Sequence, residues 1–131
     1  MINIDTNIIV RLFLADDEVQ YEKAKKIFNQ NYKFFISSYA LLEFAWVLKA
    51  KKYTRKEIYN AVNTLIELNN VFISQKDLII KSLNRYKNGK ADFADYMILE
   101  DGFYSGSKKF ETFDKTLWNE LNVWIVNEEK N

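Results

Sequence analysis

The sequence predicts an α/β fold with a mainly parallel sheet. Short apolar runs typical of strands alternate with longer segments whose apolar residues recur at helical spacing, and no linker, repeat or low-complexity segment interrupts them. Strands that alternate with helices favour parallel pairing, because each helix returns the chain to the start of the next strand. At 131 residues the chain has the size of one domain, and its 48% hydrophobic content argues against disorder. We therefore expect a single domain over residues 1–131, with a frayed polar tail over 127–131.

Three strands and four helices are expected in the first part of the chain. The strands are short and apolar, at residues 1–4, 34–37 and 71–74. Each helix follows side chains that suit an N-cap, namely Thr6 or Asn7, Asp16 or Asp17, Ser37 or Ser38, and a capping box that starts at Thr54. In the third helix we expect the large apolar residues to face the core, namely Leu41, Leu42, Ala45, Trp46 and Leu48.

The rest of the chain predicts two more strands and three more helices. Asp77 is expected to cap a helix that Asn88 and Gly89 end, and Asp92 opens a further helix that ends near Gly106. Alternating side chains predict a strand at 109–113, with Asp114 at its end. A short helix with Leu117 and Trp118 and a last strand at 123–126 complete the chain.

The composition excludes several kinds of chemistry. The chain has no His and no Cys, which removes Ser-His-Asp and Cys-His catalysis, the common zinc sites and disulfides. Carboxylates, Lys, Tyr, Ser and Thr remain, with water activated by a hard cation. The net charge of +1 provides no global positive field, so a polyanion would be held by a local patch or through a metal. No signal peptide or membrane span is visible, and we expect a soluble cytoplasmic protein.

Well-separated acidic residues occupy positions where a ligand could bind. Asp5 and Asp114 each follow an expected strand, and ligands of open α/β sheets bind beyond the carboxyl ends of strands. Glu43 lies in the helix after the second strand, and Asp92 and Asp95 share one face of a later helix. Gathered carboxylates repel one another, whereas bound Mg²⁺ or Mn²⁺ reverses that cost. The pattern indicates a divalent-metal site.

Each acid also has a purely structural interpretation. The residues alone do not decide between that role and metal binding. Asp5 and Asp92 could cap helices, and Asp114 could be a turn residue. Glu43 and Asp95 lie among apolar neighbours in the sequence, where a carboxylate is costly unless something positive binds it. Metal binding explains all of these positions at once.

Over nearly its whole length the chain resembles the PIN-domain family, in particular the VapC-type toxin ribonucleases of bacteria and archaea. The segments that carry the resemblance are Ile4-Asp5-Thr6-Asn7, Ser37-Ser38 with Leu42-Glu43 and Trp46-Val47-Leu48, Ala91-Asp92-Phe93-Ala94-Asp95, and Thr112-Phe113-Asp114-Lys115. Asp-Thr-Asn alone is a weak signal, but the ordered set at these spacings is specific. The helix after Asp95 is more aromatic than in many members.

The resemblance implies a three-layer α/β/α fold and an Mg²⁺- or Mn²⁺-dependent endoribonuclease that hydrolyses RNA phosphodiester bonds with metal-activated water. It assigns catalysis and metal binding to four residues, Asp5, Glu43, Asp95 and Asp114. Asp95 matches the third acid better than Asp92, because Asp95-Tyr96-Met97-Ile98 fits the local family pattern. Asp92 becomes a helper, for example as a ligand of a second metal, and Asn7 and Thr112 match small polar residues that orient the site.

The resemblance also implies partners. RNA, such as tRNA or mRNA, could contact the basic run Lys49, Lys51, Lys52, Arg55 and Lys56, or Lys90, Lys108, Lys109 and Lys115, although the run is equally consistent with a solvated helix end. A toxin implies a small antitoxin protein that lays a helix or strand near the site, and a homodimer is expected as well. Such a groove or dimer face could draw on aromatic residues that otherwise pack in the core, among them Tyr21, Phe28, Trp46, Phe103 and Tyr104.

Two other functions remain open at this point. A metal-dependent phosphatase with Asp5 as nucleophile would usually need a second acid two positions on, where this chain has Asn7. An inactive PIN-like module would bind RNA without cutting it, and the intact acids argue against that reading.

Overall fold

The structure, a computed structural model, describes residues 1–121 and 124–125. The chain divides into two compact units, Met1–Lys76 and Asp77–Asn131. Strands pair in parallel within each unit, so the expected α/β class with parallel strands is confirmed. A single domain over 1–131 stays a prediction. The tail at 127–131, together with the ends of the last expected strand at 123 and 126, lies outside the described residues.

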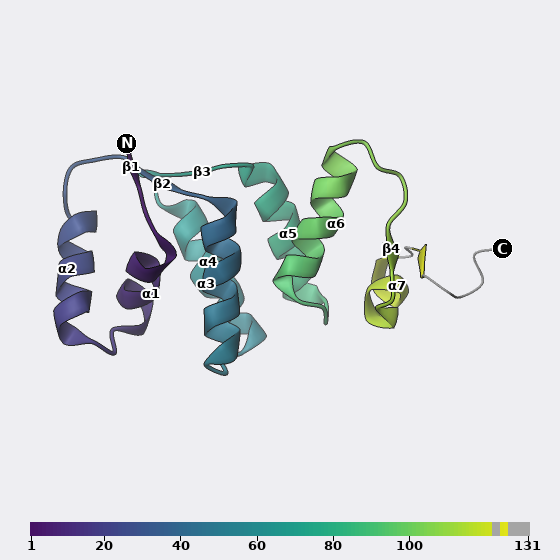
Figure 1. Cartoon of the computed structure of the whole chain (residues 1–131), viewed down its shortest axis with the longest axis horizontal. Helices are drawn as coiled ribbons and strands as arrows, with labels where there is room; N and C mark the ends of the chain where they lie inside the picture. The colour runs from purple at the N-terminus through teal and green to yellow at the C-terminus, as the bar shows by residue number, and fades with distance from the viewer. Residues whose placement is uncertain (122–123, 126–131) are drawn as a thin grey trace. The chain divides into compact units, whose positions relative to one another are not determined.

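The first unit is built on a three-stranded parallel sheet in the order β1-β2-β3 (Figure 1). Its elements are β1 (Ile2–Asn3), α1 (Thr6–Leu14), α2 (Glu18–Phe28), β2 (Phe34–Ile36), α3 (Ser38–Ala50), α4 (Arg55–Glu67) and β3 (Val71–Ile73). In register, Ile2 lies opposite Phe34, and Phe34 lies opposite Val71. The strands follow one another along the chain and in the sheet, as consecutive crossovers through helices require.

Local capping chemistry sets where the helices of this unit begin. The Asp5 carboxylate accepts from the Thr6 N–H, so Asp5 itself is the N-cap of α1 and the expectation of Thr6 or Asn7 was wrong. Asp17 caps α2 by accepting from the Gln20 N–H, and Ser37 caps α3 by accepting from the Ala40 N–H. Thr54 and Glu57 form the expected capping box of α4, each side chain accepting from the other's backbone N–H.

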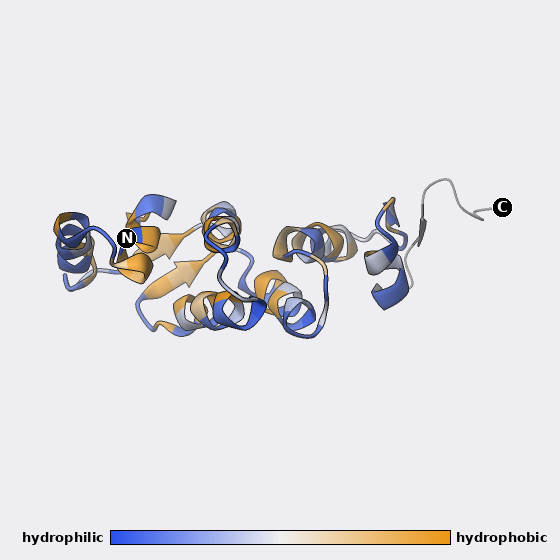
Figure 2. Cartoon of the chain, turned by 90° about the horizontal axis from the view of Figure 1, so that it is seen from below, coloured by the Kyte–Doolittle hydropathy of each residue, from blue (hydrophilic) through white to orange (hydrophobic). Residues whose placement is uncertain are grey.

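The core of the first unit lies between the sheet and its helices. Phe34 and Ile36 of β2 are fully buried, and the apolar strand residues stand out in Figure 2. Leu41 and Leu48 of α3 are also fully buried, as expected. Trp46 is 68% exposed, so its expected place in the core was wrong. It sits on the opposite side of α3, because it is half a turn away from Leu48.

The second unit contains a helix pair and a two-stranded parallel ladder. Its elements are α5 (Lys76–Asn88), α6 (Phe93–Tyr104), β4 (Glu111–Thr112), α7 (Lys115–Leu121) and β5 (Trp124–Ile125). Helix α5 starts at Lys76, so Asp77 lies in its first turn and is not its cap. Only residues 111–112 of the strand expected at 109–113 form β4.

Helices α5 and α6 are joined by buried polar contacts as well as by apolar packing. The Ser82 hydroxyl is fully buried and lies within hydrogen-bond distance of the Leu78 and Tyr96 carbonyls, at 2.8 and 3.3 Å. Arg85 of α5 donates through Nε to the buried carboxylate of Glu100 on α6. Of the helices in the part of the chain that the structure describes, none has the length and apolar character that a membrane span needs.

Candidate metal centre

A polar cavity lies where the chain leaves β1 and β2. It has a volume of about 340 Å³ and is lined by Asn3, Ile4, Asp5, Thr6, Ser37, Tyr39, Ala40 and Glu43. The cavity borders the carboxyl ends of neighbouring parallel strands, which is where α/β sheets place their ligands. The first unit thus brings together two of the expected acids, Asp5 and Glu43.

Asp5 is held in place by the backbone around it. The Ile4 N–H donates to the Phe35 carbonyl at 2.9 Å, which continues the β1–β2 ladder to the residue before Asp5. The Oδ1 atom of Asp5 accepts from the Thr6 N–H at 2.9 Å, and the Asp5 carbonyl accepts from the Ile8 N–H. Asp5 is exposed, so its second carboxylate oxygen can reach a ligand in the cavity. The capping role and a metal-binding role are therefore compatible.

Glu43 projects from α3, whose start is fixed by two serines. Ser37 caps the helix, and the Ser38 N–H donates to the Ser74 hydroxyl, just beyond the end of β3, at 3.4 Å. These bonds tie the beginning of α3 to the ends of two strands. Glu43 is exposed, although its neighbours in the sequence are apolar. The sequence predicted Ser37 as a possible helix cap and gave no indication that Ser37 and Tyr39 line a cavity.

The donor set of this cavity suits a hard cation. Two carboxylates and the Ser37 oxygen line it, and Mg²⁺ typically binds through one or two carboxylates while keeping several waters. In neither unit do three acidic side chains of the described residues gather into a metal-binding group. Asn7, expected to orient the site, is exposed on the first turn of α1 and is not part of this cavity's lining.

Asp92 and Asp95 lie together at the start of α6. Asp92 is the N-cap, and its backbone N–H donates to Oδ2 of Asp95 at 3.1 Å. Asp92 is exposed, whereas Asp95 is half-buried and precedes the buried Tyr96. The two residues form a capping box, and their carboxylates differ in burial.

Asp114 occupies the turn between β4 and α7. Its N–H donates to the Thr112 hydroxyl at 3.0 Å, and its Oδ1 accepts from the Thr116 N–H at 2.8 Å. Thr112, expected to orient the site, thus holds the backbone of Asp114. As for Asp5, the carboxylate follows a strand and contacts the first turn of the next helix.

A buried tyrosine organises the segment before Asp92. The Tyr96 hydroxyl is within hydrogen-bond distance of the Glu120 carboxylate and accepts from the Ala91 N–H, and the Lys90 N–H donates to the other Glu120 oxygen. Tyr96 is fully buried. These contacts connect α6, α7 and the loop at 89–92. Sequence reasoning missed Glu120, because nothing in its local sequence marks a partner so far along the chain.

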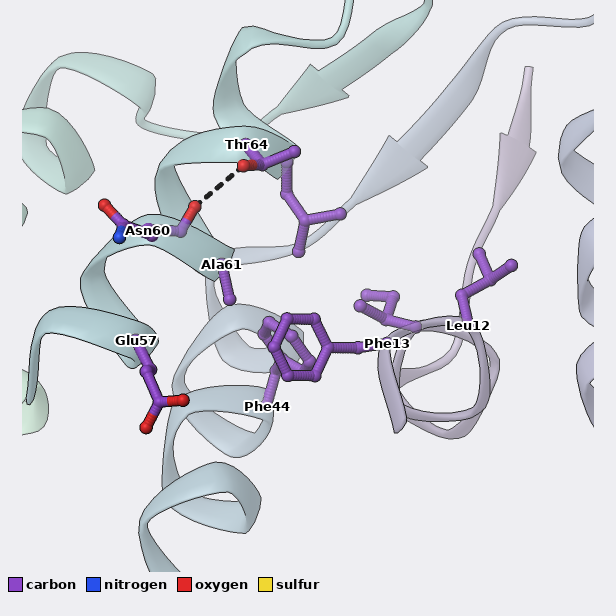
Figure 3. A pocket seen from close by; sticks show the side chains of 9 residues that line it. Leu12, Phe13, Phe44, Glu57, Asn60, Ala61 and Thr64 are labelled. Carbon is purple, nitrogen blue, oxygen red and sulfur yellow. Dashed lines mark hydrogen bonds between the residues drawn. The ribbon is translucent and has the colours of Figure 1, made fainter. Parts of the chain in front are cut away.

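A second cavity in the first unit is apolar. Its volume is about 400 Å³, and its lining residues are Ile9, Leu12, Phe13, Phe44, Glu57, Asn60, Ala61, Thr64 and Leu65 (Figure 3). The Phe13 and Phe44 rings meet edge to face with centroids 5.7 Å apart. Glu57 stands at the start of α4, and hydrogen bonds from Thr54 hold its pKa below the ordinary value. The cavity has a hydrophobic floor and a polar side along α4.

The basic residues proposed for RNA contact lie in two places. Lys49, Lys51, Lys52 and Lys56 are exposed and Arg55 is half-buried, all around the end of α3 and the start of α4. Lys51 and Lys52 help to line a further cavity of about 470 Å³. Lys115 is exposed at the start of α7, next to Asp114.

Comparison with known proteins places the chain in a family. The PIN domain model matches residues 2–121, which is most of the chain. No curated protein matches the chain, and no solved structure does. PIN domains are generally nucleases that bind divalent metal and act on RNA. The chain belongs to the PIN-domain family, a family of metal-dependent nucleases.

Proposed function

We propose that this protein is an Mg²⁺- or Mn²⁺-dependent endoribonuclease and the toxin of a toxin–antitoxin pair. The observation that carries the proposal is the cavity in which Asp5 and Glu43 meet beyond the strand ends, within a chain that the PIN model matches over residues 2–121. Carboxylates at this place suit a hard cation, and the chain has no His or Cys for another kind of hydrolytic chemistry.

The proposed metal ligands are Asp5, Glu43, Asp95 and Asp114. Asp5 and Glu43 share a cavity, and Asp95 and Asp114 are each held by backbone contacts at a helix start. Asp92 serves as a helper beside Asp95, while Asn7 and Thr112 orient the ligands. Thr112 already holds the Asp114 backbone, which supports its part of this assignment.

The chain's own residues would position the phosphodiester and keep the ligands in place. A divalent cation, when bound, lowers the pKa of a coordinated water and stabilises charge on phosphate oxygens. Asp5 keeps one carboxylate oxygen on the Thr6 N–H, which fixes the direction of the other. Lysines at the end of α3 and Lys115 beside Asp114 are the proposed contacts to the RNA backbone.

An antitoxin is the proposed regulatory partner, and the apolar cavity of Figure 3 supports this part of the proposal. Phe13 is exposed and offers aromatic surface to an amphipathic helix, which binds such grooves through its apolar face, while the buried Phe44 packs edge to face against Phe13. A homodimer in the cytoplasm is the proposed state of the free toxin.

Cleavage of a panel of structured RNAs, tRNA included, tests the activity. The purified protein is assayed with Mg²⁺, with Mn²⁺ and with EDTA, beside Asp95→Asn. We expect metal-dependent cutting that disappears in Asp95→Asn. Asp101→Asn is the matched control, because Asp101 is an exposed acid on the same helix, and it should cut like wild type.

Three outcomes separate the alternatives. RNA binding without cutting under any metal would favour an inactive binding module. Hydrolysis of a small phosphate ester with no effect on RNA would favour a phosphatase. Cutting that persists in EDTA or in Asp95→Asn would contradict the proposed metal chemistry.

A further inference from the structure

One face of α3 exposes two large aromatic side chains. Tyr39 is 81% exposed and Trp46 is 68% exposed, although both sit on a helix whose other side is the core of the unit. Tyr39 and Trp46 are seven residues apart, which is two helical turns, so they lie on the same face about 10 Å apart along the axis. Two exposed rings on one helix face offer flat apolar surface on which a ligand with aromatic rings can stack.

Glu43 lies between these two aromatics on the same face of α3. It is four residues after Tyr39 and three before Trp46, and all three side chains are exposed. Tyr39 also lines the cavity that contains Asp5 and Glu43. The aromatic face is therefore continuous with the candidate metal centre and is not a separate surface patch.

Positive charge follows the aromatic face toward the end of the helix. Lys49, Lys51 and Lys52 are exposed just after Trp46, and Lys56 is exposed at the start of α4. Lysines beside exposed aromatics suit an anionic chain that also carries flat rings, because ammonium groups bind phosphates while the aromatics stack on bases. These lysines would add no affinity for an apolar partner helix.

We infer that Tyr39 and Trp46 are stacking platforms for unpaired bases of single-stranded RNA on either side of Glu43. The inference rests on the proposed ribonuclease function and assigns base-contacting residues to it. Bases can stack on side chains only where they are unstacked from their neighbours, so loops and single strands should bind and continuous duplex should not. Tyr39 and Trp46 act as specificity-determining residues, while the carboxylates remain the metal ligands.

Binding of a fluorescently labelled oligouridylate in EDTA tests this inference without any cleavage. Fluorescence anisotropy gives the Kd for wild type, Tyr39→Ala, Trp46→Ala and Trp46→Phe at low salt. We expect each alanine variant to weaken binding about 5- to 100-fold, as loss of one base stack does, while Trp46→Phe retains most of the affinity. Tyr32→Ala is the matched control, since Tyr32 is 56% exposed in the same unit but precedes β2, and it should bind like wild type.

Two further measurements distinguish base stacking by Tyr39 and Trp46 from a role of these residues in the fold alone. Bound oligouridylate should quench tryptophan fluorescence in wild type and less so in Trp46→Phe. Binding of a duplex RNA of equal length should be weak and unaffected by Tyr39→Ala or Trp46→Ala.

The outcomes distinguish this inference from the proposed function. If wild type cuts RNA with metal but both alanine variants bind oligouridylate with the wild-type Kd, the stacking role is wrong and the nuclease stands. If the alanine variants lose affinity while no RNA is cut, the stacking role stands and the nuclease does not. A change of oligomeric state in Trp46→Ala, seen by sedimentation velocity without a change in Kd, would show an interface between copies of this chain and overturn the inference.

Discussion

Asp92 donates its backbone N–H to the carboxylate of Asp95, 3.1 Å away, across the first turn of α6. The bond is one half of a capping box that the two acids form, and the acids differ in burial. Asp95 is half-buried with one oxygen held by the backbone, and Asp92 is exposed at the N-cap. A metal ligand gains from such a fixed orientation, because less side-chain freedom is lost on binding.

The first prediction compares these two acids directly. Asp95→Asn should abolish metal-dependent cleavage, whereas Asp92→Asn should reduce it only mildly, because Asn caps a helix as well as Asp does. The rates of RNA cleavage by the two variants are compared, and thermal melting checks that both variants are folded at the assay temperature. Equal losses in both would mean that the ligand is assigned to the wrong member of the pair.

A second prediction concerns the stability of the Asp5–Glu43 cavity without metal. Asp5→Asn should leave the melting temperature in EDTA unchanged or higher, because it removes one of two like charges and keeps the cap on the Thr6 N–H. Asp5→Ala should cost about 1 kcal/mol through loss of that cap. A large destabilisation by Asp5→Asn would show that the charge itself holds the fold together.

The close approach of Gly89 to Tyr96 gives a third prediction. A Cβ atom at Gly89 would overlap the Tyr96 hydroxyl and lie 2.9 Å from the Arg85 carbonyl oxygen. Gly89→Ala should therefore destabilise the protein by about 1–3 kcal/mol and disturb the loop before Asp92.

Gly102→Ala is the matched control for that substitution. Its nearest neighbour would be the Ser107 side chain at 3.8 Å, and Gly102 lies inside α6, where Ala is favoured by up to about 1 kcal/mol. Urea denaturation of both variants measures the effect. A neutral Gly89→Ala would contradict the tight packing against Tyr96.

The capping box of α4 predicts an acid-sensitive contribution to stability. Hydrogen bonds from Thr54 lower the pKa of Glu57 in the folded protein, so the folded state favours its carboxylate. The contribution is present above the pKa of an ordinary glutamate, about 4.3, and is lost as the pH falls through the lower folded value. Glu57→Gln should flatten the pH dependence of unfolding in that window, and an unchanged slope would contradict the box.

Much of the fold could be predicted because it depends on local chemistry. Asp17, Ser37, Thr54 and Asp92 cap the helices that follow them, and an N-cap needs only a short side chain next to a helical segment. For the first helix the sequence left three possible caps, because Asp5, Thr6 and Asn7 all suit an N-cap by residue type. The contact of the Asp5 carboxylate with the Thr6 N–H decides the matter.

What failed depended on which side of an element meets the core. Trp46 was placed inside because it is large and apolar, yet Leu41, Phe44, Ala45 and Leu48 already fill the buried side of α3. Glu43 falls on the same outer side, so its exposure has the same cause. Alternation at 109–113 overstated β4, since among the described residues only Glu111 and Thr112 pair with β5.

The candidate site was predictable in its residues and not in its surroundings. Asp5 and Glu43 stand out as acids after strands, but their meeting in one cavity depends on how α1 and α3 leave the sheet. Tyr96 and Glu120 form a contact between distant parts of the sequence, and no local sequence pattern predicts it.

Binding of Mn²⁺ to single-residue variants tests most directly whether the four proposed carboxylates are metal ligands. Isothermal titration should show that Asp5→Asn, Glu43→Gln, Asp95→Asn and Asp114→Asn each weaken binding more than about tenfold, while Asp101→Asn does not. If Asp5→Asn and Glu43→Gln bind Mn²⁺ like wild type, the cavity that these residues line holds no metal and the proposed centre is wrong.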